Sequence, residues 1–117
     1  MMSKHVDNAM EKYAKLRDDL SVALRVGMNA EKDVEDDGEI NFDAPSLCLQ
    51  GWLGNEIRQA AKDAGTYAID NRYRNFRTWI FPPVSEGKAH KRTVNAVAMC
   101  NELKRRGYLA SVEHTKD

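Results

Sequence analysis

The segment DVEDDGEINFDA, residues 33–44, spaces its acidic side chains in a way that suits a metal ion. Asp33, Glu35 and Asp37 hold its first, third and fifth positions, and Gly38 holds the sixth. Ca²⁺ takes about six to eight oxygen ligands, and a loop that supplies them at alternate positions needs a glycine for its sharp turn. The spacing therefore allows two readings, a calcium loop or an acidic turn that leads into a strand.

This segment resembles the calcium-binding loop of the EF-hand family over about ten residues. Glu39, Ile40 and Asn41 match the seventh, eighth and ninth positions of that loop. The twelfth position departs from the family, because Ala44 stands where a glutamate supplies two ligand oxygens. Pro45 follows directly, and the sequence contains no second loop of this kind. We therefore expect no metal site here and no cofactor.

A second stretch, NRYRNFRTWIF at residues 71–81, interleaves arginines with aromatic residues. Guanidinium groups bind phosphates while rings stack on unpaired bases, which is how sheet surfaces bind single-stranded nucleic acid. Arg74, Phe76 and Phe81 match the first, third and last places of the third-strand signature of the RNA-recognition motif. This partial resemblance implies a nucleic-acid partner. The residues of the stretch that we assign to anion binding are Arg72, Arg74 and Arg77.

The same stretch also fits a buried strand. Asn75, Arg77 and Thr78 replace the glycine, the small residue and the second stacking ring of that signature. With Trp79 and Phe81 pointing inward, the pattern describes a strand whose rings pack in the core. The sequence leaves both readings open.

The third candidate is SEGKAHKRT, residues 85–93, at the expected start of the last helix. Helix N-termini bind anions because their first backbone N–H groups lack partners and the helix dipole is positive there. Cations at this position are slightly unfavourable for the helix, so their presence requires compensation. A bound anion, or the acidic loop around Asp36, would provide it. The side chains that we assign to this anion site are Lys88, His90, Lys91 and Arg92.

The sequence shows no catalytic or zinc-binding pattern. His5, His90 and His114 stand in separate segments, without the neighbours that nucleophilic catalysis needs. Cys48 and Cys100 have no CxxC spacing and are expected to be buried thiols of a cytoplasmic protein. We therefore expect no catalytic residues and no enzyme. A cleft that joined His90 to carboxylates would instead favour a small enzyme acting on nucleotides or phosphoesters.

Charge is unevenly distributed, although the net charge of the chain is zero. Residues 31–43 contain seven acidic residues and one lysine, which gives −6, and residues 66–107 contain nine basic and three acidic residues, which gives +6. Such asymmetry indicates an anionic partner for the basic half, or an acidic segment that folds back over it. No stretch approaches the roughly 18 consecutive apolar residues of a membrane-spanning helix, so we expect no membrane partner.

Hydrophobic periodicity predicts the elements that would position these side chains. The expected helices are residues 4–28, 45–64 and 85–106, and the expected strands are residues 38–42, 66–70, 75–81 and 108–114. From Gly38 onward this order is that of a ferredoxin-like βαββαβ domain, an α+β fold with two helices on one face of a four-stranded antiparallel sheet. We divide the chain into an N-terminal helical arm (1–30), an exposed acidic loop (31–37) and an α+β domain (38–117).

The leading functional expectation is a small intracellular binding protein that engages an anionic partner, nucleic acid, through the basic strand and the helix N-terminus. The alternative is an inhibitor or adaptor that binds a host or cellular protein through the N-terminal helix and the acidic loop, and that forms homo-oligomers through the helix. Short, highly charged domains of this kind are frequent among phage-encoded proteins, which is only an association. The residues assigned to partner binding are Met10, Tyr13, Leu20 and Leu24.

Overall fold

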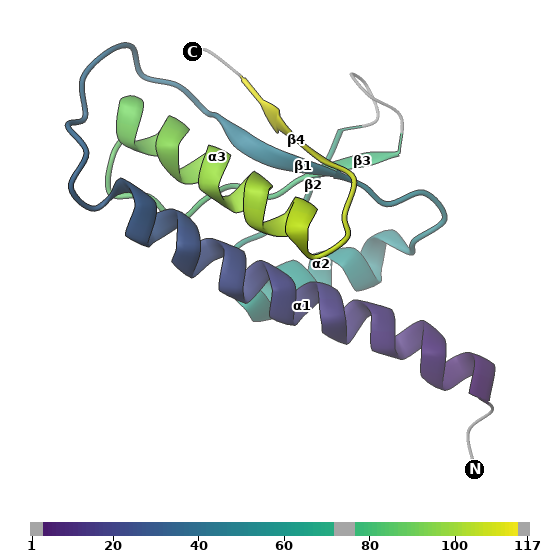
Figure 1. Cartoon of the computed structure of the whole chain (residues 1–117). Helices are drawn as coiled ribbons and strands as arrows, with labels where there is room; N and C mark the ends of the chain where they lie inside the picture. The colour runs from purple at the N-terminus through teal and green to yellow at the C-terminus, as the bar shows by residue number, and fades with distance from the viewer. Residues whose placement is uncertain (1–3, 72–76, 115–117) are drawn as a thin grey trace.

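The computed structural model describes residues 4–71 and 77–114. They form three helices and a four-stranded antiparallel sheet, which makes the fold α+β, as predicted (Figure 1). The helices are α1 (Lys4–Glu31), α2 (Gly54–Ala64) and α3 (His90–Arg105). The strands are β1 (Ala44–Cys48), β2 (Ile69–Asp70), β3 (Thr78–Ile80) and β4 (Ala110–Glu113). The predicted anion-binding residues Arg72 and Arg74 lie outside the described part of the chain.

The strands lie in the order β2-β3-β1-β4, and every neighbouring pair is antiparallel. In this register Leu47 of β1 stands opposite Trp79 of β3 and Ala110 of β4. Successive side chains of a strand point to opposite faces, so Ser46 and Cys48 lie on the other face from Leu47. The face that carries Leu47 and Trp79 is the one that packs in the core.

The position of the first strand corrects the prediction. Residues 38–42 were expected to form this strand and residues 45–64 the next helix, but β1 is Ala44–Cys48 and α2 begins at Gly54. Burial explains where the first strand lies, because residues 44–47 are buried whereas the Ile40 and Phe42 side chains are about half exposed. The two glycines of QGWLGN, residues 50–55, are the sequence signal for a loop before α2.

Pro45 is the residue that makes this strand hard to recognise, since proline suits the first turn of a helix. In the structure it precedes the first paired residue of the β1–β3 ladder, and its carbonyl accepts a hydrogen bond from the Phe81 N–H (3.0 Å). The missing N–H of proline therefore removes a bond only at the margin of the ladder, where a strand tolerates it.

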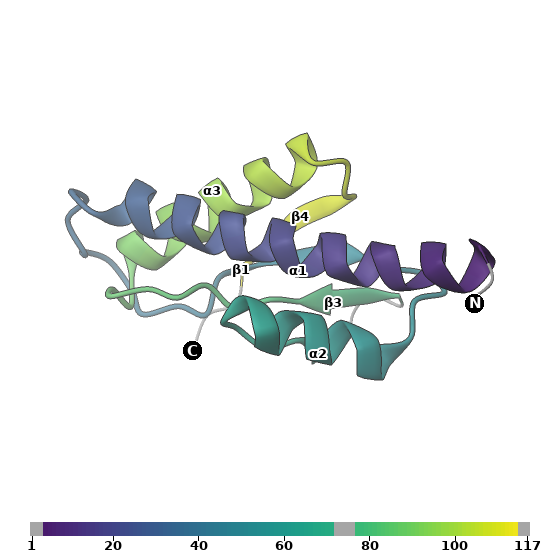
Figure 2. The ribbon, with the colours of Figure 1, turned by 90° about the horizontal axis from the view of Figure 1, so that it is seen from below.

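All three helices lie on one face of the sheet, with α1 between α2 and α3 (Figure 2). Side chains from the three helices and from the two central strands form one core. Trp79 and Phe81 belong to it, so the buried-strand reading of residues 71–81 is confirmed for these two rings. The largest apolar side chains at its centre are Leu16, Leu20, Leu47, Ile57, Phe81, Met99 and Leu103.

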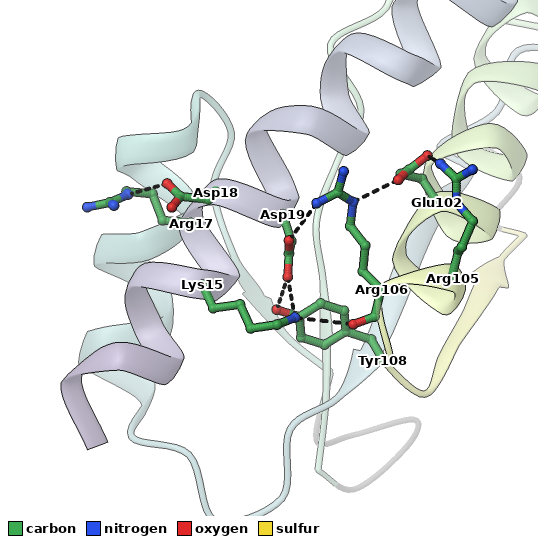
Figure 3. A network of polar contacts seen from close by, with 8 residues as sticks. All are labelled: Lys15, Arg17, Asp18, Asp19, Glu102, Arg105, Arg106 and Tyr108. Atoms are coloured by element: carbon green, nitrogen blue, oxygen red, sulfur yellow. Dashed lines mark hydrogen bonds and ion pairs between the residues drawn. The ribbon is translucent and has the colours of Figure 1, made fainter. Parts of the chain in front are cut away.

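A network of polar contacts joins α1 to the end of α3 and to Tyr108, two residues before β4 (Figure 3). Asp19, which is 5% exposed, accepts hydrogen bonds from Arg106 Nη1 (2.9 Å), the Tyr108 hydroxyl (2.8 Å) and Lys15 Nζ (2.6 Å). Arg106 Nε also donates to Glu102 (2.7 Å). Burial alone would raise the pKa of the Asp19 carboxyl, but the three hydrogen bonds outweigh it and lower this pKa. The network fixes α1 against α3 without leaving the buried carboxylate unsatisfied.

Tyr108→Phe tests this network. Burial, followed by the hydrogen bond to Asp19, raises the pKa of the Tyr108 hydroxyl well above its ordinary value. At neutral pH we expect the variant to lose about 1–2 kcal/mol of unfolding free energy, because Asp19 loses a donor. The pKa of Tyr108 is higher in the folded state than in the unfolded state, where it is about 10. The extra stability of the wild type is therefore full below about pH 10 and is lost as the pH rises through the folded-state pKa.

Urea denaturation at a series of pH values measures both effects. The control is Tyr67→Phe, because Tyr67 is 59% exposed and its loss of a hydroxyl should change the unfolding free energy by less than about 0.5 kcal/mol. A difference between wild type and Tyr108→Phe that stays constant above about pH 10 would contradict the role given to Asp19.

A second junction between α1 and α3 depends on Gly27. A Cβ atom on Gly27 would overlap Asn95 Oδ1 and would lie 2.9 Å from Met99 Cγ. Asn95 is fully buried, and its amide donates to Glu31 Oε1 (2.5 Å) and to the Val84 carbonyl (2.8 Å). The missing side chain of Gly27 therefore lets the last turn of α1 and the segment before α3 meet in one buried polar junction.

Gly27→Ala should lower the free energy of unfolding by about 1–3 kcal/mol, although alanine is the better helix former, because Asn95 must move away from its two acceptors. Chemical denaturation measures the change. Asn29→Ala is the matched control, since Asn29 is exposed on the same helix and should change stability by less than about 0.5 kcal/mol. A Gly27→Ala protein as stable as wild type would show that the close approach is not needed.

Candidate anion site at the start of α3

A carboxylate from the acidic segment, residues 31–43, caps the start of α3. Asp36 Oδ2 accepts the Lys88 N–H (2.9 Å), and Asp36 Oδ1 accepts the N–H groups of Ala89 (3.0 Å) and Lys91 (3.2 Å). A helix leaves its first N–H groups without intrahelical partners, and residue Ala89, at the N-cap position, offers no side-chain bond of its own. These backbone hydrogen bonds lower the pKa of the Asp36 carboxyl, with the bond from Lys88 as the largest cause.

Gly87 permits this approach. A Cβ atom at this position would lie 2.7 Å from Asp36 Oδ1, closer than packed atoms come. The sequence suggested two groups that could compensate the cations at this helix start, a bound anion or the acidic loop around Asp36. The three hydrogen bonds to Asp36 confirm the second.

The rest of the acidic segment follows the same stretch of chain, and this exposed segment is held there by further hydrogen bonds. The His90 N–H donates to the Asp37 carbonyl (3.1 Å), and the Asn41 N–H donates to the Lys88 carbonyl (2.9 Å). The Asn41 amide also donates to the Ala89 carbonyl (3.0 Å). The high charge of the acidic segment favours a solvated loop. Backbone groups of residues 88–91 nevertheless provide hydrogen-bond partners that the segment does not provide for itself.

The basic side chains predicted to form one anion site are divided by the fold. Lys88 and His90 are exposed, and Lys91 is half-buried beside the Asp36 cap. Arg92 turns toward the body of the protein, where its Nε donates to the Asp43 carbonyl (3.1 Å). Burial lowers the pKa of the Arg92 guanidinium, against the opposing effects of nearby acidic groups.

Arg77 lies elsewhere. Its carbonyl accepts the Leu49 N–H (3.0 Å) and its Nη1 donates to Gln50 Oε1 (3.1 Å), which places it just beyond the last residue of β1. The start of α3 lies instead beside the first residue of β1, because Thr93 and Arg92 bond to Asp43. The structure therefore brings Lys88, His90 and Lys91 together and leaves Arg77 near the other end of the strand.

A shallow pocket next to the capped helix joins His90 to carboxylates, the arrangement that would favour an enzyme. Within it, Asp43 Oδ2 accepts the Thr93 hydroxyl (2.7 Å) and lies 3.2 Å from His114 Nδ1. The Thr93 oxygen in turn accepts the Asn41 amide (3.1 Å). These groups tie β1 to α3 and to the end of β4. The lining residues are Asp37, Gly38, Glu39, Asn41, Asp43, His90, Thr93 and His114.

The sequence pattern named Asn41 in the calcium-loop resemblance and His114 among the histidines, but it did not place either of them with Thr93. One local signal was present, because asparagine two residues before Asp43 forms a turn in which Asn41 Oδ1 accepts the Asp43 N–H (3.0 Å). The bonds to Thr93 and His114 span 50 and 71 positions, so no local pattern contains them. Within the described ranges, no three His, Cys, Asp or Glu side chains are placed to hold a metal ion.

The four residues predicted to bind a protein partner have different surroundings. Leu20 and Leu24 are buried in the core, which removes them from any contact surface. The Tyr13 ring packs edge-on against Trp52 with centroids 5.3 Å apart, and its hydroxyl accepts the Leu53 N–H (2.8 Å). Met10 is 61% exposed. The apolar stripe of α1 is therefore largely the inner face of the helix.

Comparisons with known proteins gave no match. No protein-family model, no curated protein and no solved structure that was searched is similar to the chain. In the part of the chain that the structure describes, no helix has the length and apolar character needed to cross a membrane.

The capping role of Asp36 predicts a specific pH dependence. Asp36→Asn should lower the stability of the protein, and Asp33→Asn, which removes the same charge from an exposed position in the same segment, should have a smaller effect. The folded-state pKa of Asp36 is the lower one, so its contribution is full above the unfolded-state value of about 3.9 and is lost as the pH falls through the folded-state value.

Thermal unfolding of the three proteins at a series of pH values between about 7 and 2 provides the measurement. The wild type and Asp36→Asn should converge at the acid end. Equal effects of the two substitutions at neutral pH would mean that net charge, and not the cap, sets the stability of this region.

Proposed function

We propose that this protein is a small non-enzymatic binding protein whose partner is nucleic acid, bound through the cations around the start of α3. The observation that supports this proposal is the Asp36 contact, in which three backbone N–H groups already hold one oxyanion. A phosphate group presents the same kind of acceptor oxygens to the same donors. Lys88 and His90 are exposed beside it and available to further phosphates.

The separation of the cations favours a polymer over a small anion. Arg77 and the start of α3 lie near opposite ends of β1, whose five residues span roughly 17 Å. A single phosphate or nucleotide contacts one of these positions, whereas an extended strand reaches both. We assign Arg72 and Arg74, from the predicted basic stretch, to the same contact as Arg77.

We also propose that β1 to β4 form a ferredoxin-like unit. The order β2-β3-β1-β4, with two helical crossovers and antiparallel neighbours, supports this assignment. The position of α1 is an addition to that arrangement, because α1 packs against both crossover helices. The face of the sheet opposite the helices carries Ser46 and Cys48.

The enzyme and adaptor alternatives have weaker support. The pocket at His90 contains carboxylates, but the Thr93 hydroxyl in it donates its hydrogen bond to Asp43. A hydroxyl that acts as a nucleophile would instead donate to a base such as histidine. The adaptor alternative relied on α1 and the acidic segment, and both make their main contacts within this chain.

Salt-dependent binding tests the proposal. Fluorescence anisotropy of a labelled single-stranded DNA or RNA should show an affinity that falls steeply with salt. Lys88→Ala/Lys91→Ala should reduce the slope of log K against log salt concentration by about 1.4, the loss of two phosphate contacts on a single strand. Lys62→Ala/Lys104→Ala is the matched control, since it removes two exposed lysines from other helix surfaces.

Two results would overturn the assignment. Absence of binding by the wild-type protein at about 20 mM salt, where phosphate contacts are strongest, would exclude nucleic acid as the partner. An unchanged slope in Lys88→Ala/Lys91→Ala, with the control equally unchanged, would move the binding surface away from the start of α3.

A further inference from the structure

We propose that the acidic segment, residues 31–43, is an autoinhibitory contact that nucleic acid must displace from residues 86–93. This inference rests on the proposed function and concerns the regulation of the same surface. The segment carries the charge of −6 that competes with phosphates, and Asp36 occupies the backbone donors that a phosphate would use. An internal anion that covers these cations lowers the affinity of the protein for every external anion.

The segment is anchored by buried side chains at its two ends and is held by backbone hydrogen bonds between them. At one end Glu31 is 3% exposed and accepts hydrogen bonds from the Asn95 amide and from the Glu86 N–H (3.2 Å). At the other end Asp43 is 5% exposed and accepts the Thr93 hydroxyl. These bonds would hold both ends in place if the middle of the segment were lifted.

The middle of the segment buries little. Every residue from Lys32 to Ile40 is exposed except Val34, which is half-buried. Lifting these residues breaks the bonds to Asp36 and Asp37 but uncovers almost no apolar surface, so the opening needs far less free energy than unfolding of the domain. A phosphate that takes the place of the Asp36 carboxylate accepts hydrogen bonds from the same N–H groups. The free energy of the lost and the gained hydrogen bonds is therefore nearly equal.

Charge-matched variants test the inhibition. With the labelled single strand at low salt, Asp36→Asn and Asp33→Asn each remove one negative charge, but only Asp36 contacts the helix start. We expect Asp36→Asn to tighten binding about two- to fivefold more than Asp33→Asn, the value of one charge contact of this kind. Equal tightening by the two variants would show only a general effect of net charge and would overturn autoinhibition.

Amide hydrogen exchange on the wild-type protein gives a second readout that does not depend on a variant. In the complex, the His90 N–H should exchange faster, because its acceptor, the Asp37 carbonyl, is displaced. The Phe81 N–H, which bonds to Pro45 in the sheet, should be unchanged. Binding without faster exchange at His90 would overturn the inference and leave the proposed function standing. No binding by wild type or by Asp36→Asn would overturn the proposed function itself.

Discussion

The hydrogen bonds between the Asp36 carboxylate and the start of α3 determine the path of this chain. After α1 ends, the chain passes the start of α3 before it enters the sheet, because Asp36 accepts hydrogen bonds from backbone groups 52 to 55 positions later. This route brings the first residue of β1 beside the first turn of α3, where Asp43 meets Arg92 and Thr93. It also offsets the repulsion that Lys88 and Lys91 would otherwise impose on the positive end of the helix.

Much of the architecture follows from local pattern. The long amphipathic α1, the helix that ends near Arg105 and the alternating residues of β4 were all recognisable, because each has enough residues to show its period. The first strand was misplaced because its five residues include Pro45 and because acidic neighbours obscured the edge of the buried run. In the site, the compensation of the cations by the acidic loop was predictable from charge, whereas the partners of Asp43 were not, since they come from distant positions.

A run of like residues in sequence is not one surface in space. Consecutive helical residues project about 100° apart, so His90, Lys91 and Arg92 at the start of α3 cannot all face one ligand. The structure divides them accordingly, with His90 exposed and Arg92 bonded to the Asp43 carbonyl. Arg92 is partly buried and has a structural role, because it holds the connection before β1. The sequence alone does not distinguish such an arginine from one that binds a ligand.

The position of α1 between α2 and α3 sets conditions on how the protein forms. The helix is synthesised first, yet Asp19 finds its partner Arg106 only 87 positions later, and its leucines are covered by side chains of helices that do not yet exist. Contacts of such sequence separation close slowly, because the loop entropy is lost before the contacts form. The nascent chain therefore carries an uncovered apolar helix until α3 is complete, and the last third of the chain completes a core that the first third began.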